Sequence, residues 1–244
     1  MIATMQKAGV FSSLPTNGEG SLFLPCPESC RLLLVLPGAS GISGGPGYSS
    51  LAGWFWLRSY NVLLLPPPGS RGESGEYDMA RWLDKSSSIV ESLRSDREIR
   101  AINAIGTCAG GAIAAHLLNR NSCANSAKAL ALFETPLRWS AAHMTEFENH
   151  SFEAGIRPSA TCYTDLLHLA DALTHGNDAS LFAHGKDLKM PFTADDLAEV
   201  KQVLSGHRIV TIEHAGHSLL KRGPCRSLLT FCEAALNHFE LYGN

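Results

Sequence analysis

The sequence predicts an α/β fold in which helices flank a mostly parallel sheet. Short, almost wholly apolar runs are each followed by turn residues, which is the pattern of strands buried on both faces of a parallel sheet. Stretches with helical spacing lie between these runs, and strand and helix alternate to the end of the chain. The expected strands cover residues 32–36, 61–65, 101–105, 129–133, 180–183 and 208–212.

The remaining elements are predicted from the same patterns. We expect helices at residues 79–93, 110–118, 194–204 and 227–241. Ahead of the first buried strand, residues 9–14 and 21–24 flank a turn-rich hexapeptide, Pro-Thr-Asn-Gly-Glu-Gly. Such a turn joins antiparallel strands, so we expect a hairpin at one edge of the sheet.

One stretch departs from the alternation. After the sixth strand the sequence becomes polar and helical, which predicts a small helical cap at about residues 136–177, inserted into a single α/β domain spanning residues 1–244. The cap holds four of the ten histidines, which we interpret either as exposed helix residues or as part of an acyl pocket: His143, His150, His168 and His175.

Composition limits the classes of function. The chain has 244 residues, of which 45% are hydrophobic and 18% charged, so it can bury a substantial core. The net charge is -3 and the basic residues are scattered, which argues against nucleic acid or an anionic membrane as partner. Neither a signal peptide nor a membrane span is recognisable, and we expect a cytoplasmic protein.

The seven cysteines are irregularly spaced and odd in number, which disfavours a disulfide framework. Cys26 and Cys30 have no second Cys or His pair at a zinc-site distance, so we interpret them as ordinary thiols. Nothing in the sequence calls for a metal or an organic cofactor.

The sharpest signal for chemistry is Gly106-Thr107-Cys108-Ala109-Gly110, which joins an expected strand to an expected helix. A tight turn between strand and helix can expose a nucleophile in a strained conformation, and the glycines allow strand and helix to approach closely. At a helix N-terminus the dipole and unpaired N–H groups favour a thiolate. We therefore expect Cys108 to be a nucleophile; the alternative is a small buried residue at a turn.

A nucleophile of this kind needs a base and an acid from later in the chain. His217 follows the last strand in the segment Glu213-His214-Ala215-Gly216-His217, and we expect it to be the base, with His214 as the competitor. Asp187 follows the preceding strand and is the expected acid that orients the imidazole. Glu134, directly after the strand ending at residue 133, is a geometric alternative, whereas Asp195 or Asp196 would only cap a helix.

The oxyanion hole is expected to contain two backbone donors. One is the N–H of Ala109, the residue after the nucleophile. The other is expected from the glycine-rich loop at residues 37–47, with Ala39 as our choice and Ser40 or Gly45 as alternatives.

These motifs, in the order nucleophile, acid, base, resemble the α/β-hydrolase superfamily from residue 32 to about 238. The segment at residues 65–74 is similar to the one after the superfamily's fourth strand, although Pro66 stands where many relatives have Asp, and Pro37 where many have His. The strand-turn-helix segment around Cys108, the nucleophile elbow, is similar to that of dienelactone hydrolases, in which Cys replaces Ser. It is also similar to that of some Cys-type thioesterases. The resemblance implies an α/β-hydrolase fold with a cap after the sixth strand.

The expected reaction is acyl transfer through a cysteinyl acyl-enzyme. A thiolate is also a good leaving group, so activated acyl groups such as thioesters, esters and lactones are favoured over amides. The acyl substrate would be a small molecule, free or delivered by coenzyme A or a carrier protein. Hydrolysis is the first hypothesis; the alternatives are an acyltransferase or cyclase in natural-product biosynthesis, and a non-catalytic binding protein of the same fold.

Overall fold

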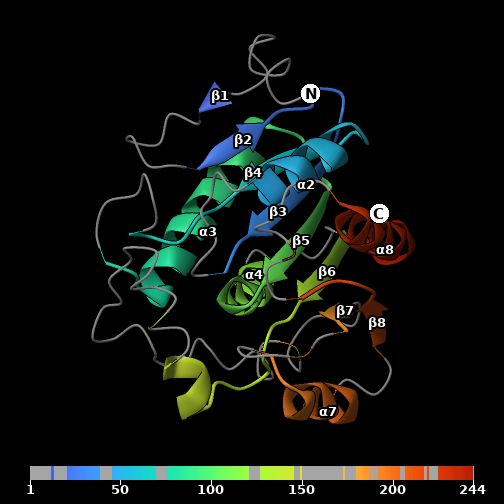
Figure 1. The fold of residues 1–244 in the computed structure, drawn as a ribbon. Helices are drawn as coiled ribbons and strands as arrows, with labels where there is room; N and C mark the ends of the chain where they lie inside the picture. Colours follow the sequence, from blue (N-terminus) through green and yellow to red (C-terminus); the bar gives the residue numbers. More distant parts are fainter. Residues whose placement is uncertain are drawn as a thin grey trace.

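The computed structural model describes residues 12–13, 21–38, 46–69, 76–120, 127–145, 149, 173, 180–186, 188, 192–203, 207–216, 219 and 225–243. Within these residues an eight-stranded sheet runs through the molecule in the order β1-β2-β4-β3-β5-β6-β7-β8 (Figure 1). The strands are β1 (Ser12–Ser13), β2 (Leu22–Leu24), β3 (Arg31–Leu36), β4 (Asn61–Leu64), β5 (Ala101–Thr107), β6 (Ala127–Phe133), β7 (Ser180–Gly185) and β8 (Arg208–Ile212).

The sheet is mostly parallel, as expected. Strands β3 to β8 pair in parallel, while β2 pairs antiparallel with both β1 and β4. The β1–β2 pair is the expected hairpin, and β1 lies at the edge of the sheet. Since all the parallel strands point the same way, their carboxyl ends meet at one edge, where α/β sheets place their ligand sites.

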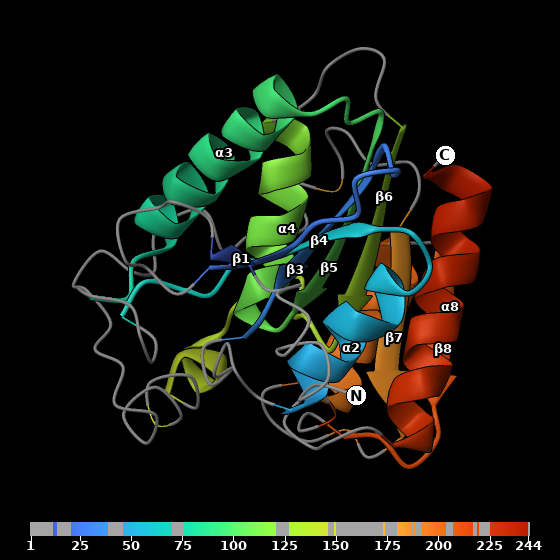
Figure 2. The same cartoon turned by 90° about the horizontal axis from the view of Figure 1, so that it is seen from above.

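Among the described residues, the longer helices cover the two faces of the sheet: α2 (Pro46–Trp56), α3 (Met79–Asp96), α4 (Ala109–Arg120), α7 (Ala194–Val203) and α8 (Arg226–Tyr242). Figure 2 shows α3 and α4 on one face, and α2 and α8 on the other. The strand side chains alternate between the two faces: Leu34 packs in the core under α3 and α4, whereas Val35 packs under α2 and α8.

One helix was not expected from the sequence. Helix α2 begins at Pro46, inside the stretch that we interpreted as a glycine-rich loop. Proline suits the first helical position, because its missing N–H would have no acceptor there and its φ is already helical. The loop after β3 is therefore shorter than expected, and its exit is fixed by a helix.

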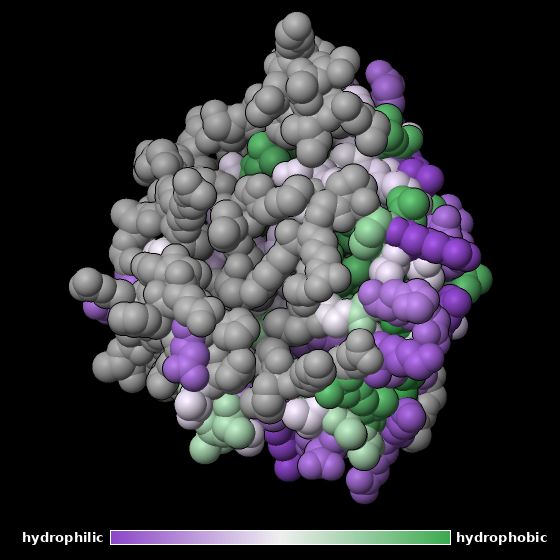
Figure 3. Space-filling model, viewed as in Figure 1, coloured by the Kyte–Doolittle hydropathy of each residue, from purple (hydrophilic) through white to green (hydrophobic). Residues whose placement is uncertain are grey.

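The expected cap falls mostly outside the described residues, which include only 136–145, 149 and 173 of it. On the described surface, Figure 3 shows hydrophilic side chains interrupted by small hydrophobic patches. The large apolar side chains that are exposed there are Leu57, Val203, Leu229, Leu241 and Tyr242. Among the described helices, none has the length and apolar character needed to cross a membrane.

Candidate active site

Cys108 lies at the junction of β5 and α4, where the sequence places it. Its φ is 50°, in the left-handed region that a residue with a Cβ adopts only at a cost. Two backbone bonds hold it: its N–H donates to the Phe133 carbonyl at 3.2 Å, and its own carbonyl accepts the Gly111 N–H at 3.0 Å. The first bond ties the turn to β6 and the second begins α4, so the strained conformation is fixed from both sides.

The glycines around this turn are required by close backbone approach. A Cβ on Gly106 would lie 2.4 Å from the Gly111 Cα, and a Cβ on Gly110 would lie 2.3 Å from the Leu36 carbonyl oxygen. Neither distance is possible between real atoms without moving the backbone. Helix α4 can therefore start directly against β3 and β5 only because both positions are glycine.

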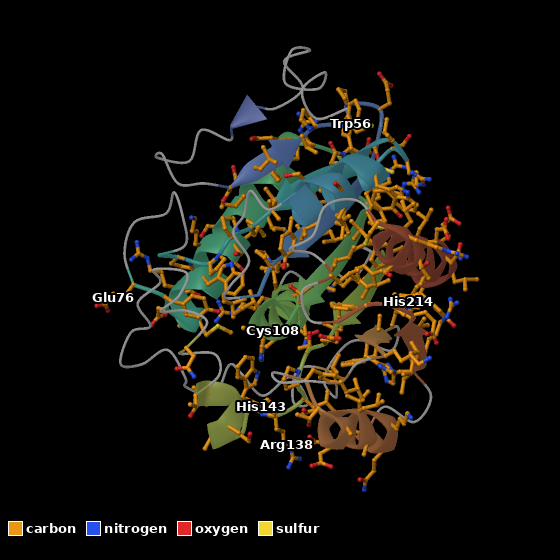
Figure 4. The ribbon with its side chains drawn as sticks, in the orientation of Figure 1. Trp56, Glu76, Cys108, Arg138, His143 and His214 are labelled. Atoms are coloured by element: carbon orange, nitrogen blue, oxygen red, sulfur yellow. The ribbon has the colours of Figure 1, made fainter. Side chains whose placement is uncertain are left out.

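The surroundings of the sulfur are only partly described. The Cys108 side chain is 5% exposed, and the central position of the residue is visible in Figure 4. As the first residue of α4, Ala109 has an N–H with no acceptor inside its own helix, which suits its expected role as an oxyanion donor. The expected second donor, Ala39, lies outside the described residues, as do the alternatives Ser40 and Gly45.

His217 and Asp187, the expected base and acid, also lie outside the described residues. The competitor His214 is described: it is exposed, has a φ of 57°, and lies apart from Cys108 in Figure 4. It lines a cavity of about 660 Å³ between the end of β8 and the start of α8, which the described residues form without Cys108.

Glu134 is a buried carboxylate at the same edge of the sheet. It follows β6 directly, is 1% exposed, and has a φ of 45°. Its Oε1 accepts the Gly185 N–H at 2.9 Å. A Cβ on Gly185 would lie 2.8 Å from this Oε1 and 2.3 Å from the Ala215 carbonyl oxygen. The carboxylate, the end of β7 and the segment leading to residue 217 therefore meet in one small space.

The histidine His143 corrects one expectation about the cap. It is not exposed, since it is buried against Asp196 of α7 with Nε2 and Oδ1 3.1 Å apart. Its Nδ1 accepts the Ser140 backbone N–H at 2.9 Å, so Nε2 carries the proton that Asp196 accepts. The other cap histidines, His150, His168 and His175, lie outside the described residues.

The partner of His143 is a capping residue, as the sequence indicated. Asp196 Oδ2 accepts the Thr193 N–H at 2.7 Å and the Thr193 hydroxyl at 2.6 Å. Burial alone would raise the pKa of Asp196, but the hydrogen bonds from His143 and Thr193 outweigh it and lower that pKa. The first turn of α7 is thereby joined to the start of the cap. The spacings Ser140-x-x-His143 and Thr193-x-x-Asp196 resemble capping boxes, a signal that our predictions from the sequence did not use.

Two more polar residues beside Cys108 were not anticipated. Tyr48 of α2 and Thr107 of β5 are both buried, and their hydroxyl oxygens lie 2.8 Å apart. No local pattern predicts this pair, because it depends on how α2 returns to the sheet.

Comparison with known proteins shows that the fold of the chain is a known one. No family model and no curated protein sequence matches the chain. A lipase-esterase related protein from Clostridium acetobutylicum superposes on it with a TM-score of 0.63 at 16% identity, over 91% of this chain and 99% of that one. At such low sequence identity, the structural likeness shows only that the two chains share a fold.

Two further structures carry the same fold. Dienelactone hydrolase from Anabaena variabilis matches with a TM-score of 0.63 at 14% identity, over 96% of this chain and 97% of that one. A thioesterase domain from the curacin biosynthetic pathway matches with a TM-score of 0.63 at 15% identity, over 93% of this chain and 98% of that one.

Proposed function

From the α/β-hydrolase fold that these structures share with the chain, we propose an acyl-transfer enzyme that uses Cys108 as its nucleophile. Our first hypothesis for the molecule that finally accepts the acyl group is water. The observation that carries the proposal is the left-handed φ of 50° at Cys108, on a turn that is closed by glycines. A buried structural cysteine gains nothing from such strain, whereas a nucleophile gains access to a substrate held at the sheet edge.

The proposed reaction begins when His217 takes the proton of the Cys108 thiol and the resulting thiolate attacks the carbonyl carbon of a thioester, ester or lactone. The carbonyl π electrons move to oxygen, and backbone N–H groups, one of them from Ala109, stabilise that oxyanion. The oxyanion then collapses, the bond to the leaving group breaks, and the leaving group takes a proton from His217. Water, deprotonated by His217, attacks the resulting thioester, and the Cys108 thiolate leaves.

The acid that orients His217 is the open part of this triad. Asp187 remains our first choice from its position after β7, and Glu134 is supported by its burial beside the segment that leads to His217. Asp187→Asn and Glu134→Gln separate the two. The variant that has lost the triad acid is expected to lose about 10⁴-fold in turnover, because the imidazole is no longer held in the reactive tautomer.

The test of the nucleophile is intact-protein mass spectrometry after mixing with a panel of acyl thioesters, activated esters and lactones. The native chain should gain the mass of one acyl group, and Cys108→Ala should gain none. Cys30→Ala is the matched control, because Cys30 is an exposed thiol outside the proposed site and its removal should leave the adduct in place. Burial raises the pKa of Cys232 to about 12, so this thiol should not compete.

An adduct that persists in Cys108→Ala, or that disappears in Cys30→Ala, would contradict the proposal. Product analysis with an added amine or alcohol then separates hydrolysis from transfer or cyclisation. With water as the acceptor the free acid dominates, whereas a transferase gives the amide or the ester.

A further inference from the structure

The cavity between the end of β8 and the start of α8 does not include the proposed nucleophile. Figures 1 and 2 both show β8 and α8 next to each other. Residues from 211–216 form one wall of the cavity, residues from 225–230 form the other, and Leu219 also lines it. All of these lining residues are described, so the chemistry of the cavity can be read directly.

The charges in the lining favour a negatively charged ligand. Glu213 has a cation beside it, because its Oε2 lies 3.1 Å from Lys186 Nζ. Arg226 and His214 are both exposed, and within the part of the chain that the structure describes neither has a carboxylate partner. A guanidinium that no carboxylate neutralises can bind an anion.

The hydroxyl groups that α8 contributes to the lining are already used. The Ser227 hydroxyl donates at 2.9 Å to a carbonyl of the opposite wall, that of Glu213, and the Thr230 hydroxyl donates at 3.1 Å to a carbonyl of its own helix. The first of these bonds also joins the two walls, so the cavity is formed without a ligand. Arg226 and His214 are left to bind a polar group.

The size of the cavity decides which kind of anion fits. Its volume is about 660 Å³, which is in the range of pockets for drug-sized molecules and far above the volume of an inorganic ion. Ala215 and Leu219 in the lining are both buried, and they offer apolar surface. A ligand that fills the cavity therefore carries an apolar body as well as a charged group.

We propose that this cavity is a binding site for an amphiphilic carboxylic acid, of which a medium-chain fatty acid is the simplest form. The carboxylate binds Arg226, with His214 beside it, and the alkyl chain covers Ala215 and Leu219. A guanidinium suits a carboxylate because its planar fork donates two parallel hydrogen bonds. The site does not depend on the reaction proposed at Cys108.

Cys225 provides a direct measure of occupancy. It lines the cavity, is partly buried, and makes no capping hydrogen bond with its side chain at the start of α8. Iodoacetamide should alkylate this thiol, and a ligand in the cavity should block the reagent. Peptide mass spectrometry gives the alkylation rate of Cys225 at increasing concentrations of octanoate.

Protection should be confined to this thiol. At an octanoate concentration about ten times its Kd, alkylation of Cys225 should slow about 10-fold, because only about a tenth of the cavities are then empty. Cys30 is the internal control, since it is exposed and does not line the cavity, and its alkylation rate should stay unchanged. The same protection is expected in Cys108→Ala.

The charge is tested by one variant and its matched control. Arg226→Gln should raise the octanoate concentration for half-protection by roughly 10- to 100-fold, the loss expected for a charge-assisted hydrogen bond. Arg226→Lys keeps the charge and should recover part of this loss. Arg208→Gln removes the same charge at the opposite end of β8 and should change nothing. Half-protection concentrations are compared because they do not depend on the intrinsic reactivity of the thiol.

The ligand class is tested on the native chain. Octanamide has the same apolar body without the charge, and inorganic phosphate has charge without an apolar body, so both should protect Cys225 far less than octanoate does. From butanoate to octanoate, each added methylene should tighten binding by up to about 4-fold.

The outcomes separate this site from the proposed function. Octanoate that leaves Cys225 fully reactive, or that protects Cys108 alone, overturns the site. Equal protection by octanamide or inorganic phosphate overturns the ligand class, and protection unaffected by Arg226→Gln overturns the role of Arg226. A native chain that forms no acyl adduct on Cys108 but shows the expected protection overturns the proposed function and leaves this site standing.

Discussion

The left-handed conformation of Cys108 predicts an unusual response to glycine. We consider Cys108→Gly and Cys108→Ala, both of which remove the sulfur. In an ordinary helical position alanine is the more stable choice, because glycine has more freedom to lose on folding. At a φ of 50° backbone strain favours glycine instead, since only a residue with a Cβ is strained in this conformation.

The magnitude is the sum of three contributions. Relief of the left-handed strain favours glycine by about 1–2 kcal/mol. The unfolded-state entropy favours alanine by about 0.4–1 kcal/mol, and burial of the alanine methyl against Gly38 favours it by up to about 0.8 kcal/mol. The net difference is therefore expected to lie between about 0.8 kcal/mol in favour of alanine and about 1.6 kcal/mol in favour of glycine.

Urea unfolding followed by circular dichroism measures this difference. The control pair is Glu91→Gly and Glu91→Ala on the exposed face of α3, where alanine should win by about 1 kcal/mol. An alanine advantage of about 1.5 kcal/mol or more at position 108 would mean that the backbone there is relaxed, and the argument from strain to a nucleophile would fail.

Three further results are expected. Asp196→Ala should lose about 2–3 kcal/mol in urea unfolding, because it leaves His143 buried without its acceptor, whereas the exposed Asp195→Ala should lose under about 1 kcal/mol. Since the pKa of Asp196 is lowered by folding, its stabilisation is complete above the unfolded value of about 4 and is lost as the pH falls below it, so native and Asp196→Asn stabilities should converge in acid. Gly110→Ala should lower the melting temperature sharply, because its Cβ would lie 2.3 Å from a β3 carbonyl oxygen; Gly216→Ala, with nothing within 4 Å, should change it little.

Much of the fold was predictable because each buried strand is a local pattern. The runs at 101–105 and 129–133 became β5 and β6, where β5 ends two residues later than expected and β6 begins two residues earlier. Helix α2 escaped detection because Pro46 and Gly47 continue a glycine-rich segment and read as loop, although proline also begins helices. The residues after the proline decide between loop and helix, because Leu51 and Phe55 are buried one helical turn apart and pack against the sheet.

The candidate site was predictable only in part, for a related reason. The strand, turn and helix around Cys108 are contiguous in the sequence, so the chemistry of the elbow is visible there. Tyr48, Thr107 and Gly38 meet through pairing of β3 with β5 and through the return of α2, which no local pattern reports. His143 illustrates the same limit, since its partner Asp196 lies 53 positions further along the chain.

The link between His143 and Asp196 bears on how this chain can diversify. The anchored His143 lies ten residues after the end of β6, and the chain rejoins the sheet at Ser180, the first residue of β7. With both its ends secured, lengthening such a connection is inexpensive: doubling the number of residues adds only about 0.6 kcal/mol of closure entropy. Insertions between residues 146 and 179 should therefore cost little stability as long as the contact between His143 and Asp196 is kept.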